Sequence, residues 1–588
     1  MRRPDVEADA VDVGSGPGGA TAAEVLTGAG WDVVVLEKGP NRLLELEPPY
    51  SLKGELSGDE IKLWFRWFLG PDPLLEPRSY RRTEADGERL LVGEVNNLPS
   101  GVGGGAVHAD AKMPRFREED FRPLSQWGPV EGASIADWPL DYDELEPYYA
   151  EAEALVGVAG EAGANPFAAW RSAPFPMPPG PDMYGALLSA AAAERLGYHP
   201  YRAPTAINTV PYDGRPACVN CGFCGGYGCP IGAKGDPLGP LRRALGTGRC
   251  DLRPRSTVTE VLLDGSARRA RGVRYRDEAG TLHEVAARYV VLAGGAFETP
   301  RLLLRCGLAN SSGLVGRNLT FHFQTFVAGG FPFRLHPHRG RVVTHLHDDF
   351  LVPTAADLSA ARAAGLPWVR GGVVEHGSGP GPVMEALTYP PGPVHNQLMR
   401  ESVARDRLWV FTMQGEDMPQ PTNRVDLDPT VRDVNGLPAG RVTYRPHSHE
   451  LFASDRWGPP LEQVLREAGA TWTNISTSPP LDPAPAGPLG LAPASRHVMG
   501  TCRMGADPAT SVVDAFGRFH DVENMLCADS SVFVTATGYN PTLTIVALAV
   551  RACRHLVGAP LPATRRPVPA PGPDGAVTPG AGPGSSPR

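Results

Sequence analysis

The chain lacks the marks of several broad classes of protein. Its 588 residues include 56 Lys and Arg against 65 Asp and Glu, so the formal net charge is −9 and there is no basic surplus for nucleic acid. No apolar run is long enough to cross a membrane. The first expected strand begins within about ten residues of Met1, which leaves no space for the apolar core of a signal peptide. We therefore expect a cytoplasmic protein without a membrane span.

A disulfide framework and internal repeats are not expected either. Nine cysteines in a cytoplasmic protein rarely pair. The chain is too long for one compact core, so it should hold two domains that follow each other or interleave. Five cysteines are scattered and are expected to be buried free thiols: Cys250, Cys306, Cys502, Cys527 and Cys553.

The other four cysteines form one cluster, Cys218-x2-Cys221-x2-Cys224-x4-Cys229, followed by Pro230. Four thiols this close together suit a soft metal ion or a metal cluster. The last gap is one residue longer than in a ferredoxin-type run that ends in Cys-Pro, whereas zinc sites generally use two well-separated pairs of ligands. An iron–sulfur cluster, a zinc site and a loop without metal all stay open.

The N-terminal residues predict a strand–loop–helix–strand unit. A strand over 8–13 leads into Gly14-Ser15-Gly16-Pro17-Gly18-Gly19, a small-residue helix follows, and 33–36 is an apolar run typical of a buried parallel strand. The glycines of such a G-x-G-x-x-G run allow a tight turn and the close approach of backbone to a pyrophosphate at the helix N-terminus. Glu37 ends the second strand, where an acid accepts the hydroxyls of an adenosine ribose. The unit predicts a site for NAD or FAD.

The rest of the chain predicts two kinds of sheet. Strands are expected at 258–263, 272–275 and 289–292, and a helix follows the last of them. From about 321 to 478, alternating patterns and short turns predict a mostly antiparallel sheet. Asp12 does not fit, because a strand buried on both faces should not hold a carboxylate.

Pro, Gly and Ala are concentrated in two further stretches. Residues 478–494 predict a long loop between domains, and the residues from 558 onward predict a disordered tail.

A second glycine-dense stretch, 99–116, and a late run from His497 to Asn540 complete the pattern. Gly101, Gly103, Gly104 and Gly105 allow backbone to lie flat against a cofactor ring or its phosphates, and His108 follows them.

The late run reads HVMGTCRMG at its start and YNPTLTI at its end. It places an imidazole and a carboxamide in one segment, a pairing suited to removing a proton from an alcohol.

Together these segments resemble the glucose-methanol-choline (GMC) oxidoreductase family of flavoenzymes. The resemblance is carried by the nucleotide loop, by Gly103-Gly104, by 295–303 (GAFETPRLL), and by His497 together with Asn540-Pro541-Thr542. It implies an α/β fold, α+β overall, in which a Rossmann-like FAD-binding domain is interleaved with a substrate-binding domain built on a mostly antiparallel sheet. The implied segments are 1–120, 245–320 and 495–557 for FAD binding and catalysis, 121–244 for a lid with the cysteine loop, 321–494 for substrate binding, and 558–588 for the tail.

The resemblance also implies roles for individual residues. FAD would lie extended between the N-terminal glycine loop and the C-terminal segment. An iron–sulfur cluster in the cysteine loop would match the bacterial sugar dehydrogenases of the family. His108 is either a packed, hydrogen-bonding histidine or a point of covalent flavin attachment. The expected FAD contacts are Gly14, Gly16 and Gly19 at the diphosphate with Ser15 between them, Glu37 at the ribose, Val258 at the adenine, Asp529 at the ribityl–diphosphate region, Gly103 and Gly104 at the ring or its phosphates, and Pro541 and Thr542 near the isoalloxazine.

His497 and Asn540 are the expected catalytic residues. His497 would take the hydroxyl proton of an alcohol while hydride passes to flavin N5, and Asn540 would hydrogen-bond the same oxygen. The implied activity is oxidation of a sugar-like, polyol or other alcohol, with an aminoglycoside or other natural-product intermediate as the alternative. The electron acceptor (O2, a quinone or a redox protein) stays open. A flavin and cysteine-loop module for electron transfer or redox sensing is the alternative of another class.

Overall fold

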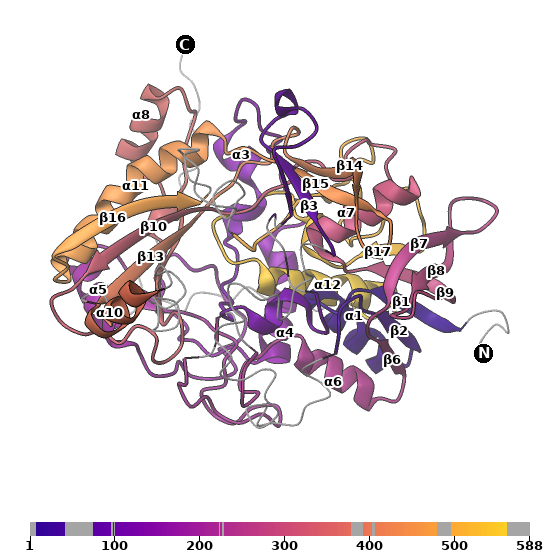
Figure 1. Ribbon diagram of the computed structural model, residues 1–588, viewed down its shortest axis with the longest axis horizontal. Helices are drawn as coiled ribbons and strands as arrows, with labels where there is room; N and C mark the ends of the chain where they lie inside the picture. The colour runs from indigo at the N-terminus through magenta and orange to yellow at the C-terminus, as the bar shows by residue number, and fades with distance from the viewer. Residues whose placement is uncertain are drawn as a thin grey trace, which may run out of the picture.

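The described part of the computed structural model holds three sheets with helices packed around them (Figure 1). It comprises residues 7–41, 75–93, 95, 98, 100–222, 224–225, 228–377, 392–402, 406–478 and 495–560. The expected loop over 479–494 and the expected tail beyond 560 therefore lie outside the described residues. No helix within these ranges is long and apolar enough to cross a bilayer. The expected fold class, a mixed α/β architecture, is confirmed.

The first sheet contains the predicted nucleotide unit. Its order is β6-β2-β1-β9-β8-β7, with β17 also paired to β9, and β6, β2, β1, β9 and β17 run parallel. The strand expected over 289–292 is β9, and it begins earlier than expected. Its first half pairs with β8 in an antiparallel meander, and its second half pairs with β1. The strands are β1 (Ala8–Val13), β2 (Val33–Leu36), β6 (Cys250–Arg253), β7 (Thr257–Leu263), β8 (Ala270–Arg276), β9 (Leu282–Leu292) and β17 (Met525–Cys527).

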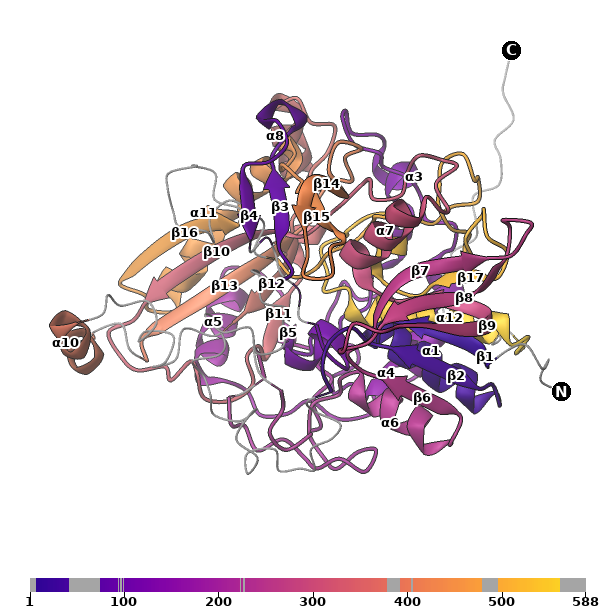
Figure 2. The same cartoon turned by 45° about the vertical axis from the view of Figure 1, so that its right-hand side comes forward.

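Helices cover this sheet because their small residues permit close packing. In α1 (Pro17–Gly28), Ala20, Ala22 and Ala23 are fully buried. This helix packs against α12 (Thr542–Leu556) and α6 (Leu238–Gly246), and α12 also packs against α4 (Tyr142–Val156). The first and last described helices of the chain thus lie side by side, as the indigo and yellow ribbons show (Figure 2).

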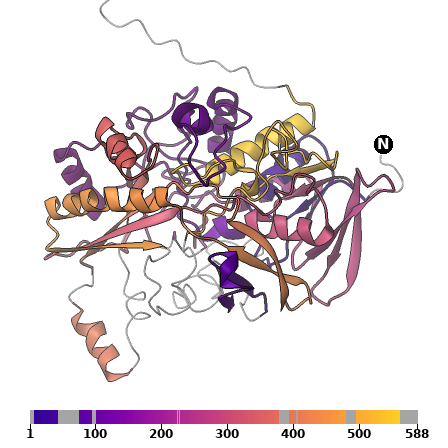
Figure 3. The ribbon, with the colours of Figure 1, turned by 90° about the horizontal axis from the view of Figure 1, so that it is seen from above.

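The second sheet is antiparallel throughout, as predicted for the central region. Its order is β16-β10-β13-β12-β11-β5, and α11 (Ser448–Glu467) and α5 (Tyr184–Arg195) pack against it. Seen from above, α11 lies along this sheet as the long orange helix (Figure 3). The strands are β5 (Tyr201–Arg202), β10 (Phe323–Gly330), β11 (His345–His347), β12 (Gly372–His376), β13 (Leu408–Gly415) and β16 (Trp472–Ser478).

Strand alternation divides the side chains of this sheet between its two faces. Apolar residues such as Val327, Phe411 and Met413 form a core with residues of α11 and α5. Gln324 stands directly opposite Gln414, and Glu375 lies two residues after the partner of Gln414 in β12, so these polar side chains share the other face. That face is the one that reaches the cavity described below.

A small third sheet joins distant parts of the chain. Its order is β14-β15-β3-β4, so strands near residue 80 pair with strands of the central region. The strands are β3 (Arg78–Arg81), β4 (Leu91–Gly93), β14 (Arg424–Arg432) and β15 (Pro438–Thr443). The remaining α-helices are α3 (Pro123–Trp127), α7 (Gly295–Cys306), α8 (Ala355–Ala363) and α10 (Pro393–Glu401).

Candidate active site

A cavity of about 520 Å³ is lined by residues of both large sheets, a size typical of small-molecule and cofactor sites. We call the part lined by Gly14 to Gly16 and Glu37 the nucleotide end, and the part lined by Gln324, Gln414, His497 and Asn540 the catalytic end. The cavity wall contains most of the predicted site residues: Gly14, Ser15, Gly16, Glu37, Gly104, His108, Val258, His497, Asp529, Asn540, Pro541 and Thr542. The predicted Gly19 and Gly103 lie behind this wall and support it.

The glycines of the nucleotide end are required by the fold as well as by a ligand. A Cβ on Gly18 would lie 1.6 Å from the Ala528 carbonyl oxygen, and one on Gly19 would lie 2.0 Å from the carbonyl oxygen of Gly14. Gly14 has φ +106°, in the left-handed region. Gly16 differs, because a Cβ there would meet no protein atom within 4 Å. The open side of the loop is therefore at Gly16, next to the first turn of α1, whose N–H groups have no intrahelical acceptor.

Ser15 connects the two glycine-rich stretches to the acid of β2. Its hydroxyl accepts a hydrogen bond from the backbone N–H of Gly103 (3.0 Å) and donates one to Glu37 Oε2 (2.7 Å). The backbone N–H groups of Ser15 and Gly39 also donate to the Glu37 carboxylate. The carboxylate is thus held in the cavity wall with known orientation, and lone pairs remain on its oxygens for a ribose.

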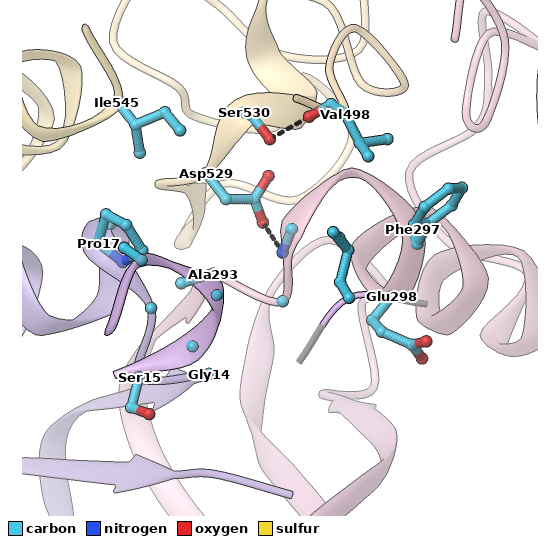
Figure 4. A pocket seen from close by; sticks show the side chains of 18 of the residues that line it. Gly14, Ser15, Pro17, Ala293, Phe297, Glu298, Val498, Asp529, Ser530 and Ile545 are labelled. Carbon is cyan, nitrogen blue, oxygen red and sulfur yellow. Dashed lines mark hydrogen bonds between the residues drawn. The ribbon is translucent and has the colours of Figure 1, made fainter. Parts of the chain in front are cut away.

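Asp529 holds the beginning of α7 rather than projecting freely into the cavity (Figure 4). Its Oδ2 accepts hydrogen bonds from the Gly295 N–H (2.8 Å) and the Thr299 hydroxyl (2.6 Å), and its Oδ1 accepts two from Ser531. A carboxylate at a helix N-terminus is stabilised by the helix dipole. Asp529 therefore fixes the α7 end of the cavity wall, and Ser530 beside it donates to the Val498 carbonyl.

The imidazole of His497 lies between a second histidine and an amide. Its Nδ1 is 2.8 Å from Nδ1 of His322, and its Nε2 is 3.5 Å from Nδ2 of Asn540. His322 Nε2 is 3.1 Å from the carbonyl oxygen of Ala536. Burial, followed by the nearness of His322 and Lys112, lowers the pKa of His497 well below its usual range. The imidazole is therefore uncharged at neutral pH, as a general base must be.

The buried carboxylate of Glu375 holds the amide of Asn540. Glu375 Oε1 accepts hydrogen bonds from Asn540 Nδ2 and Gln414 Nε2, both at 3.1 Å, and Oε2 forms an ion pair with Lys112 Nζ at 2.7 Å. Asp110 is the second partner of Lys112, at 3.1 Å. Sequence reasoning did not find Glu375, because an acid in the strand GVVEH does not show which face it occupies or which residue it meets.

His108 supplies a buried ring atom to the cavity. Burial, followed by the charges of Lys234 and Arg496, lowers its pKa to about 4. Its Nε2 has no hydrogen-bond partner among the described residues, so it is available to a ligand. Both interpretations of His108, a hydrogen-bonding residue and a covalent attachment point, stay predictions.

The cysteine loop gives no support for the predicted iron–sulfur cluster. Cys218, Cys221, Cys224 and Cys229 are free thiols, and no group of three His, Cys, Asp or Glu side chains within the described ranges is arranged to hold a metal ion. Burial raises the pKa of the Cys224 thiol to about 12. The loop packs instead behind the cavity, where the Lys234 ammonium donates to the carbonyls of Ala109 and Cys224.

Comparisons with known proteins identify the family of the chain. Two models described as GMC oxidoreductase match residues 179–324 and 419–549. The 2-methyl-1,2-propanediol dehydrogenase of Mycolicibacterium austroafricanum is 32% identical over 93% of this chain and 94% of that protein. The paromamine 6'-oxidase of Streptomyces fradiae is 31% identical over 94% and 91%.

A solved structure has the same fold. The crystal structure of a pyridoxine 4-oxidase from Mesorbium loti superposes with a TM-score of 0.60 over 93% of this chain and 98% of that one, at 17% sequence identity. Since the dehydrogenase and oxidase relatives match over nearly their whole length, the protein belongs to the GMC oxidoreductase family and is an FAD-dependent alcohol dehydrogenase or oxidase.

Proposed function

We propose that the protein oxidises a CH–OH group of a polyol or sugar-like alcohol to a carbonyl, with His497 as the general base and Asn540 as the group that binds the reacting oxygen. The observation that carries this proposal is the pair of atoms at the catalytic end, a basic ring nitrogen 3.5 Å from an amide nitrogen. An alcohol hydroxyl can donate to the first and accept from the second at the same time.

The residues present fit FAD. The open side of the loop at Gly16 and the N-terminus of α1 suit a diphosphate, and the held carboxylate of Glu37 suits a ribose. The unpartnered Nε2 of His108 and the start of α12, which follows Pro541 directly, suit the polar edge of a ring system. When bound, FAD supplies the flavin N5 that accepts a hydride.

Glu375 determines which atom of Asn540 the substrate meets. If the amide were turned over, Oδ1 would face the Glu375 carboxylate and the two would repel each other, so Nδ2 is the atom held between Glu375 and His497. The substrate oxygen then accepts a hydrogen bond from Nδ2 and gives its proton to Nε2 of His497. A positioned base of this kind contributes about 10²–10⁴-fold to the rate.

The lining of the catalytic end supports a substrate with several hydroxyl groups. Gln324 and Gln414 are joined by a hydrogen bond of 3.1 Å and present amides to the cavity. Lys112 is paired with both Glu375 and Asp110, so its charge does not select for an anionic substrate. Relatives named for a diol and for an amino sugar support the same range of substrates, with an aminoglycoside as the alternative to a neutral polyol.

The test is anaerobic reduction of the bound flavin by a panel of diols, sugars, sugar alcohols and aminoglycosides. We expect bleaching by at least one hydroxyl compound, and a loss of about 10²–10⁴-fold in the reduction rate of His497→Ala with FAD retained. His283→Ala, at a half-exposed histidine of β9 that is bonded to Asp277, is the control and should reduce like the unmodified protein. Unchanged reduction kinetics in His497→Ala would refute the assignment. The rate of reoxidation by air or by a quinone in the same cuvette then separates oxidase from dehydrogenase.

A further inference from the structure

We propose that His322 is a positioning residue that fixes the tautomer of His497, so that the lone pair of His497 lies on Nε2 and faces the substrate. The inference rests on the proposed function, because it concerns the way His497 is prepared to act as a base. It follows from a chain of hydrogen bonds in which each partner determines which nitrogen of the next imidazole carries the hydrogen.

The chain begins at the carbonyl oxygen of Ala536. A carbonyl oxygen only accepts hydrogen bonds, so the His322 Nε2 that lies 3.1 Å from it carries the hydrogen. His322 is fully buried, and burial lowers its pKa to about 4. The ring is therefore neutral, and its other nitrogen, Nδ1, has a lone pair and no hydrogen.

The second link is the contact between the two histidines. Their Nδ1 atoms are 2.8 Å apart, and the rings stand at 82° to each other, so the contact joins two nitrogens and is not a stack of ring faces. A hydrogen bond of this length needs one hydrogen between the nitrogens. Because His322 Nδ1 has none, the hydrogen belongs to His497 Nδ1, and Nε2 of His497 is left unprotonated.

The opposite side of His497 leads independently to the same tautomer. Nε2 lies 3.5 Å from Asn540 Nδ2, an atom that is oriented by its hydrogen bond to Glu375. An N–H on Nε2 would face the N–H of the amide, with two donors and no acceptor. A lone pair on Nε2 removes this conflict.

The tautomer has a consequence for the reaction. The hydroxyl proton moves to Nε2, and the O–H electron pair becomes the second bond of the carbonyl as hydride leaves the carbon. The charge that appears on His497 is then stabilised by the Nδ1–H bond to the His322 lone pair. In the serine-protease triad, the group that orients the catalytic imidazole through its second nitrogen is worth up to about 10⁴-fold; here a neutral imidazole takes the place of that carboxylate.

The first test compares His322→Phe, His322→Asn and His497→Ala in the full-length holoenzyme. Phenylalanine keeps a buried ring but offers no acceptor, so we expect the flavin reduction rate to fall about 10²-fold or more while the substrate Kd stays within about threefold. Asparagine has both an acceptor and a donor, so we expect it to recover the rate to within about tenfold of the unmodified protein. A merely structural role would alter FAD content and Kd together and would not be rescued by asparagine.

The second measurement needs no variant at position 322. In protein labelled with ¹⁵N-histidine, the signals of His497, assigned by their loss in His497→Ala, should show a protonated Nδ1 and an unprotonated Nε2 at neutral pH. A protonated Nε2, or a His322→Phe variant that reduces flavin within threefold of the unmodified rate while His497→Ala is slow, would overturn the inference and leave the proposed function standing. Fast reduction in His497→Ala would overturn both.

Discussion

The two ends of the cavity are built from different parts of the polypeptide. At the nucleotide end, the short run from Gly14 to Gly18 supplies backbone to the wall, next to the Glu37 carboxylate. At the catalytic end, side chains such as Lys112 and His497 line the cavity, and His322 and Glu375 hold them through hydrogen bonds and an ion pair. These four residues come from separate segments of the chain. A contiguous motif can encode the first kind of site, whereas the second kind exists only once the chain has folded.

The largest effect that this comparison predicts is at Gly18. Alanine there would place Cβ 1.6 Å from the Ala528 carbonyl oxygen, which cannot move without shifting Asp529 and the short 3-10 helix Ser530–Val532 that follows it. We expect Gly18→Ala to lose the folded holoenzyme altogether, with no FAD recovered after purification. Flavin absorbance per protein and the thermal unfolding midpoint of the apoprotein measure the two losses.

Gly16→Ala is the matched control for that substitution. The φ of Gly16 is −64°, and the added methyl meets no protein atom within 4 Å. The apoprotein should therefore unfold at the unmodified temperature while FAD affinity falls, because the methyl occupies the space next to the diphosphate. If both variants bound FAD normally, the backbone would not be forming the nucleotide end.

The next largest effect concerns Glu375, at the catalytic end. Glu375→Ala leaves Asn540 Nδ2 without its acceptor and Lys112 without its nearer partner. We expect flavin reduction to slow by about 10- to 100-fold, the size of a lost hydrogen bond to a charged group. Glu375→Gln keeps an acceptor for Asn540 and should lose less.

The control for Glu375 is Glu467→Ala, which breaks an exposed ion pair with Arg195. Exposed pairs contribute little, so its reduction rate should not change. Stopped-flow reduction under saturating substrate separates the rate from Kd. Equal rates in Glu375→Ala and Glu467→Ala would contradict the role given to the carboxylate.

A smaller effect is a shift in pH dependence on removal of Lys112. The charge of Lys112 is one of the causes that lower the pKa of His497. The unmodified protein should therefore reduce flavin at a constant rate from about pH 5 to 8, where His497 is neutral. Lys112→Met removes that charge and leaves Glu375 and Asp110 without their ammonium partner, so the pKa of His497 rises and the acid limb of the rate profile moves to higher pH.

The distinguishing result is at low pH. At pH 8 the Lys112→Met variant should reduce flavin within about twofold of the unmodified rate, whereas at pH 5 it should be slower than the unmodified protein. Rates measured across this range with one substrate at saturation are sufficient. Profiles of the same shape would mean that Lys112 does not act on the base.

The sequence predicted the nucleotide end well because periodicity and glycine spacing act over short distances. The strands and helix around Gly14 to Glu37 and the start of α12 after Pro541 are where they were expected. Sequence reasoning also singled out His497 and Asn540, through a resemblance. It missed His322 and Glu375 as their partners, since nothing local shows that residues 322 and 497, or 375 and 540, become neighbours.

The prediction of smallest effect concerns Asp12, a side chain of β1 that lies just before the glycines of the nucleotide end. Asp12 is fully buried, and its strand lies between β2 and β9. Its carboxylate oxygens have no hydrogen-bond partner among the described residues, and burial raises its pKa well above the usual range. The folded state therefore holds the Asp12 proton more tightly than the unfolded state, so stability falls as pH rises from the unfolded pKa near 3.9 toward the folded one. Asp12→Val should stabilise the protein by about 1–3 kcal/mol, more at pH 8 than at pH 5, without changing flavin reduction.

Asp9→Val, in the same strand, should do the opposite, because Asp9 accepts hydrogen bonds from Asp32 and Arg288. Thermal midpoints of both variants at the two pH values test this prediction. If Asp12→Val destabilises the protein like Asp9→Val, then Asp12 has a partner in the working protein.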